Sequence, residues 1–140
     1  MIWKCNDSIQ DLTERSKNTL VENLGISYIE IGEDFISAKM PVDNRTMQPY
    51  GILHGGASLA FAETLGSVAA RLSIDNSKKR CVGLEINANH VRPVSAGFVY
   101  GVVKPLNLGN SIHVWQIEIS NEEGKLVCIS RMTLSILDKI

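Results

Sequence analysis

The sequence predicts an α+β protein in which an antiparallel sheet wraps around one long buried helix. Two patterns indicate this class. Residues 55–72 carry small and apolar side chains with almost no charge, as expected of a helix that is covered on most sides. From residue 82 onward, polar and apolar side chains alternate with the period of two that is typical of strands. Because no linker or repeat divides the 140 residues, we expect a single domain over residues 1–140.

The composition excludes several classes of protein and of function. Hydrophobic residues make up 44% of the chain and charged residues 21%, which is typical of a globular protein and excludes a disordered or fibrous one. A net charge of −1 gives no electrostatic support for nucleic-acid binding. No apolar run approaches the ~20 residues of a membrane-spanning helix, and the N-terminus lacks the pattern of a signal peptide. Three cysteines without a Cys-x-x-Cys pair, and three histidines far apart, favour a reduced cytoplasmic protein without a metal site.

The first part of the chain is expected to contain one helix and two strands. Asp7-Ser8 is typical of a helix cap and predicts a helix over about residues 9–24, which Gly25 ends. Two strands follow, over residues 26–31 and 35–40, with a polar turn between them.

The long helix is expected over residues 55–72, after an irregular polar stretch. Inside it only Glu63 and Arg71 are charged. Four strands are expected after the helix, over residues 82–89, 98–103, 111–119 and 126–137, with a hairpin turn at residues 121–124. One face of the first of these strands is expected to carry Val82, Leu84, Ile86 and Ala88.

Glu63 is the most informative residue, because a charge in the middle of an apolar helix is costly to bury. Ser67 lies one helical turn later on the same face. Two structural explanations for a charge at this position stay open: Glu63 lies on an exposed seam of the helix, or it forms an ion pair with an arginine. The functional explanation is that Glu63 is a catalytic carboxylate.

The start of the same helix offers hydrogen-bond donors. His54-Gly55-Gly56 places glycines at a helix N-terminus, where N–H groups are unpaired and an oxygen can approach closely. Such an N–H group is half of an oxyanion hole, and the Gln48 amide is a candidate for the other half. Ordinary turn glycines and a loop amide are the alternatives.

The spacing of these groups predicts a dimer. Eight residues separate Gly55 from Glu63, which corresponds to ~12 Å along a helix. One carbonyl carbon must lie ~3 Å from both the carboxylate and the oxyanion donors. A single helix cannot meet this requirement, but two antiparallel copies that cross near Leu59 can. We therefore expect a two-fold dimer with shared sites.

These residues resemble a known family. Gln48-Pro49-x-Gly51-x-x-His54-Gly55-Gly56, followed by Glu63, resembles the hotdog-fold acyl-CoA thioesterases, and residues 40–43, 45–49, 83–90 and 92–94 add to the likeness. The chain looks most similar to the bacterial branch that hydrolyses 1,4-dihydroxy-2-naphthoyl-CoA in menaquinone synthesis. A sister branch removes misloaded aryl groups from the carrier protein of enterobactin synthesis. The resemblance extends from Trp3 to Leu137.

The resemblance implies a role for each site residue. Glu63 would act as nucleophile or general base, and the Gly55 N–H group and Gln48 would polarise the thioester carbonyl. His54 would orient the thioester or the attacking water, and Ser67 would help to hold that water. The residues that would bind coenzyme A are Val82, Asn89, His90, Val91, Arg92, Leu106, Asn107, Leu108, Gly109, Asn110 and Ser111. Arg92 and the basic run at residues 78–80 are candidates for phosphate contacts, with a solvated loop as the alternative for the run.

We therefore expect a cytoplasmic hydrolase of aryl- or acyl-CoA thioesters, with 1,4-dihydroxy-2-naphthoyl-CoA as the leading substrate. No cofactor is expected, since coenzyme A is part of the substrate. The expected assembly is a homodimer with shared active sites, and a tetramer built as a dimer of dimers. The alternatives are a broad-specificity or proofreading thioesterase for acyl-CoA or an aryl-carrier protein, and a non-catalytic acyl-CoA-binding protein. A related hydratase is disfavoured, because the Asp-x4-His motif is absent and Gln48 occupies the histidine position after Asp43. A Cys-His hydrolase is weaker still, because no cysteine lies near His54 in the sequence.

Overall fold

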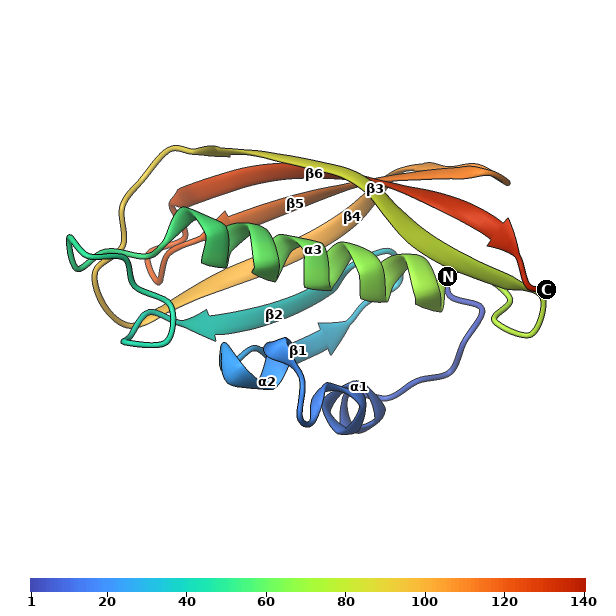
Figure 1. Ribbon diagram of the computed structural model, residues 1–140, viewed down its shortest axis with the longest axis horizontal. Coiled ribbons are helices and arrows are strands. Elements are labelled where there is room, and N and C mark those ends of the chain that lie inside the picture. The colour runs from blue at the N-terminus through green and yellow to red at the C-terminus, as the bar shows by residue number, and fades with distance from the viewer.

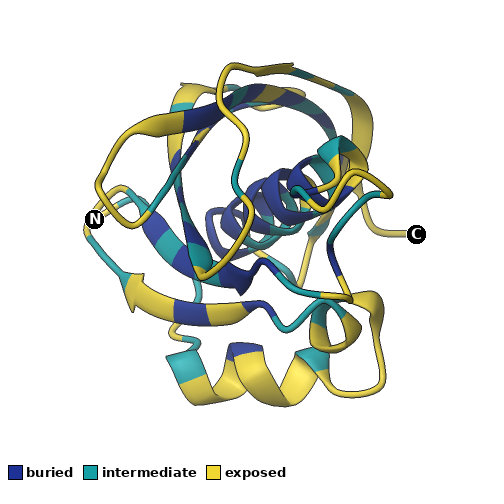
Figure 2. Cartoon of the chain, turned by 90° about the vertical axis from the view of Figure 1, so that its left-hand side faces the viewer, coloured by how far each residue is buried: buried dark blue, intermediate teal, exposed yellow.

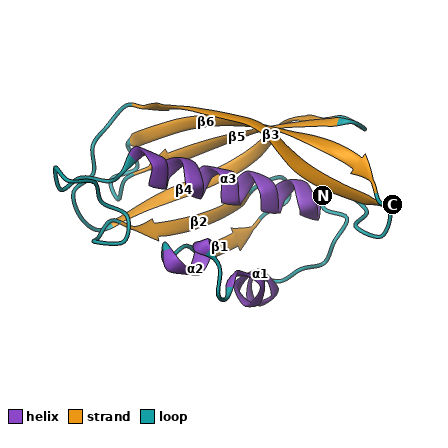
Figure 3. Ribbon diagram, in the orientation of Figure 1, coloured by secondary structure: helices purple, strands orange, loops and turns teal.

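The computed structural model of the protein describes all residues, 1–140. Six strands form one antiparallel sheet in the order β1-β2-β4-β5-β6-β3. The helices are α1 (Ile9–Ser16), α2 (Leu20–Asn23) and α3 (Gly55–Leu72), and the strands are β1 (Ser27–Ile31), β2 (Ile36–Pro41), β3 (Lys79–His90), β4 (Phe98–Leu108), β5 (Ile112–Ser120) and β6 (Leu126–Asp138). The sheet curves around α3, and the short helices lie beyond β1 (Figures 1 and 3). The predicted α+β class is therefore confirmed.

The long helix α3 forms the centre of the core (Figure 2). Phe61, Leu65 and Ala69 have no exposed surface, and they pack against the inner face of the sheet. At Gly101 of β4 the helix comes so close that a Cβ atom would lie 2.7 Å from Leu65 Cδ1 and 2.9 Å from Phe61 Cζ. Only glycine lets the helix lie at this depth in the sheet. The predicted bounds of this helix, residues 55–72, are confirmed.

The first residues of the chain cover the C-terminal end of α3. The Lys4 and Cys5 N–H groups both donate to the Leu72 carbonyl, at 2.7 and 3.2 Å. Trp3 stacks on the buried Trp115 of β5, with ring centroids 6.3 Å apart and planes at 3°. Trp3 Nε1 also donates to the Gly32 carbonyl at 2.6 Å. The N-terminal segment is therefore part of the packed structure.

The prediction of one helix over residues 9–24 is wrong, because two short helices occupy this range. Ser8 caps α1 as predicted and accepts a hydrogen bond from the Asp11 N–H group at 3.1 Å. The helix then stops, because Asn18 adopts a left-handed φ of 60° and Thr19 starts α2 as a new N-cap. Polar residues of this kind compete for backbone hydrogen bonds and favour helix ends. The break therefore gives two short helices in place of one continuous helix.

The prediction that Val82, Leu84, Ile86 and Ala88 share one face of β3 is wrong at the start of the strand. A bulge between Gly83 and Glu85 shifts the register, so that Gly83 and Ile86 pair with the buried Leu134 and Met132 of β6. The hydrophobic side chains of Val82 and Leu84 are left 43% and 59% exposed. Since β3 is also the last strand of the sheet, its outer edge has no strand partner. An exposed apolar edge strand of this length is a surface that another strand can cover.

One further difference is small. The strand β4 continues to Leu108, beyond the predicted end at residue 103, so residues 106–108 belong to a strand. The predicted turn at residues 121–124 is present, with Gly124 at a φ of 76° and the Asn121 side chain accepting two backbone hydrogen bonds. None of the helices combines the length and the apolar character that crossing a membrane would require.

The contact at Gly101 predicts a stability effect. Gly101→Ala should lower the free energy of unfolding by about 1–3 kcal/mol, because an added methyl group overpacks the contact with Phe61 and Leu65. Urea denaturation measures the change. Gly66→Ala in α3 is the comparison. Its methyl group also meets a buried side chain, with Met132 Sδ at 2.7 Å, but methionine is unbranched and the change gains about 1 kcal/mol of helix propensity, so the loss should be smaller than at Gly101. Equal stability of Gly101→Ala and the wild type would show that α3 has room to move away from β4.

Candidate active site

The loop before α3 is held in one conformation by its own hydrogen bonds. The buried Thr46 hydroxyl donates to the Pro41 carbonyl at 2.7 Å, and the Thr46 carbonyl accepts from the His54 N–H group at 2.8 Å. An isolated β-bridge joins Met47 to Leu53. The loop therefore presents the residues just before the helix on a fixed backbone.

Two hydrogen-bond donors are left unpaired near the start of α3. The Gln48 Oε1 atom accepts from the Tyr50 N–H group, so the side-chain NH₂ group points elsewhere and has no acceptor in the chain. The Gly55 N–H group is the first of the helix and likewise has no acceptor. Both residues line one cavity of about 420 Å³. This arrangement has the donor character of an oxyanion hole.

His54 is the N-cap of α3. Its Nδ1 atom accepts a hydrogen bond from the Gly56 N–H group at 2.8 Å. An acceptor at Nδ1 places the ring proton of the neutral imidazole on Nε2. The exposed ring therefore offers one N–H donor to its surroundings, and the cap restricts its orientation.

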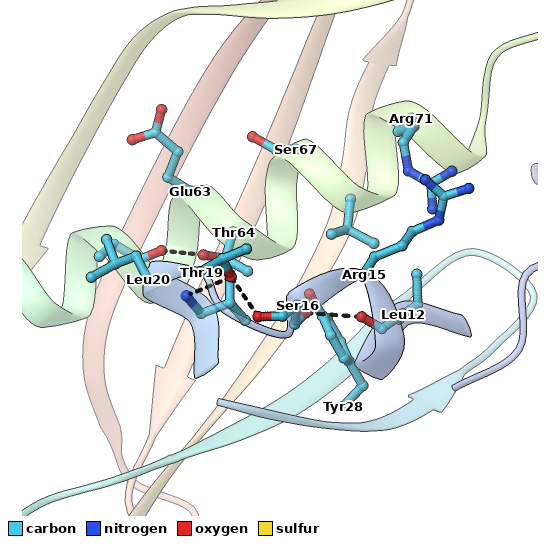
Figure 4. Close-up of a pocket in the computed structure, with 13 residues that line it drawn as sticks. Leu12, Arg15, Ser16, Thr19, Leu20, Tyr28, Glu63, Thr64, Ser67 and Arg71 are labelled. Atoms are coloured by element: carbon cyan, nitrogen blue, oxygen red, sulfur yellow. Dashed lines mark hydrogen bonds between the residues drawn. The ribbon is translucent and has the colours of Figure 1, made fainter. Parts of the chain in front are cut away.

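Glu63 lies on the wall of a second cavity of about 440 Å³, between α3 and the α1–α2 segment (Figure 4). Ser67 lines the same cavity one turn further along α3. The Glu63 carboxylate makes no ion pair, so the alternative of a structural pair with an arginine is wrong. Glu63 is exposed, and it reaches toward the edge strand, where a Cβ atom at Gly83 would lie 3.4 Å from its Oε1 atom. The carboxylate is therefore available for chemistry at the open side of the sheet.

The candidate catalytic residues are thus divided between two cavities of the chain. Glu63 and Ser67 line one, whereas Gln48 and Gly55 line the other. Gly55 and Glu63 belong to one helix, eight residues and ~12 Å apart. One chain does not bring the donors and the carboxylate to the same reacting atom.

The residues predicted to bind coenzyme A are divided in the same way. Val82 and Ile112 both pair with Ser135 of β6, which puts Val82 at the same end of the sheet as residues 106–111. His90 pairs with Cys128 at the other end, eight residues along β3 and roughly 26 Å away. One chain therefore does not unite residues 89–92 with residues 106–111.

The predicted coenzyme A residues line a different cavity at each end of the sheet. His90 lies against Gly55, where a Cβ atom would be 3.0 Å from its Nε2 atom, and His90, Val91 and Arg92 line the cavity of Gln48. At the other end, Leu108, Gly109 and Asn110 line a cavity of about 440 Å³ together with two lysines of the basic run at residues 78–80. One of these, Lys79, pairs with Asp138 at 2.5 Å, which reduces its availability for a phosphate.

The sequence analysis missed the part of the Glu63 cavity that the N-terminal region builds. The additional lining residues are mainly Leu12, Arg15, Ser16, Thr19, Leu20 and Tyr28. No motif marks them, because only the break between α1 and α2 and the packing on β1 place them near α3. Burial raises the pKa of Tyr28, while the Ser16 hydroxyl and the Arg71 guanidinium act in the opposite direction.

A sheet wrapped around a central helix, with a free carboxylate on the helix and unpaired donors at its start, has the groups that a hydrolase acting on a carbonyl group needs. The family model of the thioesterase superfamily matches residues 50–128. The chain belongs to this superfamily, and its hotdog fold and its class as a thioesterase are confirmed.

Similar proteins support the assignment over the full chain. A 1,4-dihydroxy-2-naphthoyl-CoA hydrolase of Escherichia coli is 51% identical over 137 residues, which cover 98% of this chain and 100% of that protein. The proofreading thioesterase EntH of Cronobacter turicensis is 49% identical over 138 residues, covering 98% and 99%. The crystal structure of a thioesterase from Haemophilus influenzae matches with a TM-score of 0.96 and 51% identity, covering 99% of this chain and 96% of that one.

Proposed function

We propose that the protein hydrolyses aromatic CoA thioesters, with 1,4-dihydroxy-2-naphthoyl-CoA as its main substrate and 1,4-dihydroxy-2-naphthoate and coenzyme A as products, in menaquinone biosynthesis. The observation that carries the proposal is the unpaired Glu63 carboxylate on the wall of a cavity of about 440 Å³. This volume is in the range of small-molecule sites. The similarity to the hydrolase of Escherichia coli supports this substrate.

In the proposed mechanism, Glu63 acts on the thioester carbonyl in one of two ways. As a nucleophile, its carboxylate adds to the carbonyl carbon, the thiolate of coenzyme A leaves, and water hydrolyses the resulting anhydride. As a general base, it takes a proton from the water that attacks the carbonyl. Ser67, on the same face of α3, would hold that water. A thiolate with a pKa of ~8.5 leaves without a strong proton donor, so a single carboxylate suffices.

The negative charge that develops on the carbonyl oxygen needs donors. The unpaired Gly55 N–H group and the Gln48 NH₂ group are suited to this role, because both are held on fixed backbone and face the same cavity. The Nε2–H group of His54 would orient the thioester. These donors would come from one chain and Glu63 from another.

We further propose a homodimer in which the α3 helices lie antiparallel. The separation of Gly55 from Glu63 requires two chains, and the exposed edge of β3, with Val82 and Leu84, provides a surface for a second copy. The division of the residues for coenzyme A between the two ends of the sheet supports the same arrangement. A tetramer built as a dimer of dimers follows from the family resemblance.

The test of the function is a panel of substrates measured with the wild type and with Glu63→Gln. We expect the highest kcat/KM for 1,4-dihydroxy-2-naphthoyl-CoA, and lower values for benzoyl-CoA, straight-chain acyl-CoA and an aryl-carrier protein thioester. Glu63→Gln should keep the fold and lower kcat by ~10²–10⁴-fold, because an amide is neither nucleophile nor base.

Glu30→Gln is the matched control, since it makes the same change at an exposed position on β1 and should leave kcat unaltered. A faster reaction with the carrier protein would favour a proofreading enzyme. Full activity of Glu63→Gln would exclude Glu63 from the mechanism.

Gln48 is tested by removing its donor in two ways. Gln48→Ala should lower kcat by roughly 10–10³-fold with little change in KM, as expected for one oxyanion donor. Gln48→Glu keeps the acceptor for the Tyr50 N–H group but replaces the free NH₂ group by an oxygen, so its loss should be at least as large. Gln116→Ala, an amide on β5, serves as the control. A change in KM alone would make Gln48 a binding residue only.

The shared site is tested by mixing inactive variants. Glu63→Ala and the double variant Gln48→Ala/His54→Ala are unfolded and refolded together in equal amounts. Random pairing makes about half of the dimers mixed, and each mixed dimer has one intact site of two, so activity should recover to ~25% of the wild type. Native mass spectrometry checks the exchange. An inactive mixture with confirmed exchange would show that each site uses one chain.

A further inference from the structure

The cavity beside Glu63 extends along one face of α3. Glu63, Ser67 and Arg71 are spaced four residues apart and all line this cavity (Figure 4). From Glu63 to Arg71 the helix rises by ~12 Å. The cavity therefore has a carboxylate at one end of this face and a guanidinium group at the other.

A second arginine reaches the same end from α1. Arg15 Nε and Arg71 Nη2 both approach the Asp7 Oδ2 atom, at 3.5 and 2.7 Å. Two cations thus share one carboxylate, and Asp7 itself does not line the cavity. The remaining N–H groups of both guanidinium groups have no acceptor in the chain.

The other acids near Arg15 have partners of their own. Asp11 accepts hydrogen bonds from Ser8, and Glu14 pairs with Lys17 at 3.0 Å. The Arg71 side chain is 25% exposed and that of Arg15 is 65% exposed. Two guanidinium groups therefore face the cavity, one from a half-buried position and one from a more open position, and the only carboxylate in its lining, that of Glu63, lies at the other end.

The rest of this region is suited to hold a ring. Leu12, Val21, Ala60 and Val68 supply apolar walls between the two charged ends. Ser16 and Tyr28 also line the cavity, and each carries a hydroxyl group close to the arginines. Apolar walls with a few convergent polar groups are typical of a site that binds one orientation of a ligand.

We propose that Arg15 and Arg71 select acyl groups that carry an acidic oxygen, a carboxylate or phenolate, at the end remote from the thioester. This inference rests on the proposed function, which puts the thioester carbonyl beside Glu63. It extends the substrate range, because 1,4-dihydroxy-2-naphthoyl-CoA has no acidic group on the ring remote from the thioester. An acyl group that starts there and follows α3 ends at the two guanidinium groups. Guanidinium groups form charge-assisted hydrogen bonds with such an oxygen, in a fixed geometry that an ammonium group does not reproduce.

The test compares two substrates that differ only at the remote end, 2-naphthoyl-CoA and 6-carboxy-2-naphthoyl-CoA. We expect the wild type to prefer the carboxylated thioester in kcat/KM. Arg15→Met and Arg71→Met should each reduce that preference, the ratio of the two kcat/KM values, about ten-fold, the effect of losing one charge-assisted hydrogen bond. The preference should also weaken as salt rises.

Matched variants separate recognition from folding. Lys125→Met removes an exposed positive charge from the turn before β6, away from the cavity and from every ion pair, and should leave the preference unchanged. Arg71→Lys keeps the pair with Asp7 but lacks the planar fork, so it should restore stability and only part of the preference. Arg15→Met is the safer variant for folding, because the side chain is mostly exposed.

A binding measurement distinguishes failure of this inference from failure of the proposed function. Calorimetry with the Glu63→Gln variant measures the affinity for both thioesters without turnover, and the carboxylated one should bind more tightly unless Arg15 or Arg71 is replaced. Equal affinities, or a preference that survives both arginine replacements, would overturn the role of the arginines. Hydrolysis without such a preference would leave the thioesterase function intact, whereas tighter binding without hydrolysis would support the role of the arginines alone.

Discussion

A straight α-helix cannot bring its first residue and its ninth to the same point. In this protein that constraint separates the free N–H group of Gly55 from the carboxylate of Glu63 by ~12 Å, on the most deeply buried helix of the fold. The helix cannot bend to shorten the distance, because Phe61 and Leu65 fix it against Gly101 of β4. The rigidity that positions each group also prevents one chain from combining them. The remaining features of the site, from its exposed edge strand to its divided cavities, are consistent with this constraint.

The same helix gives the two groups different electrostatic surroundings. Gly55 lies where unpaired N–H groups favour negative charge, next to a loop whose hydrogen bonds hold the Gln48 amide in one orientation. Glu63 lies in mid-helix, where the backbone dipoles of the helix offer a carboxylate no special support, and it has no ion-pair partner. Because Glu63 is exposed, water solvates its carboxylate, and the group needs no ion-pair partner to stay charged at the surface of the fold.

The sequence was informative where local chemistry decides the structure. The glycines at its start, the small residues and the lack of charge together predicted the bounds of α3, and alternation located the later strands. It was misleading where a single residue departs from the regular pattern. Asn18 adopts a left-handed conformation that splits the first helix, and the bulge at Leu84 reverses the faces of β3. No glycine or proline marks Asn18, whereas Gly83, directly before Leu84, is a bulge signal inside the strand pattern.

For the site, the motif around His54 and the spacing to Glu63 located the groups of one helix, and their division between cavities followed from helix geometry alone. Arg15 and Tyr28 could not be predicted to lie near them, because they come from separate elements whose meeting depends on tertiary packing. The catalytic roles remain predictions, since position alone does not report turnover.

The segment that covers the end of α3 has a consequence for how the chain is made. Trp3, Lys4 and Cys5 are synthesised before the Leu72 carbonyl and the Trp115 ring that they contact. Until Trp115 is made, Trp3 has no ring to stack on, and until Leu72 is made, the Lys4 and Cys5 N–H groups lack their native acceptor. The contacts of this segment therefore form only after most of the chain has been synthesised, so its docking belongs to the late steps of folding.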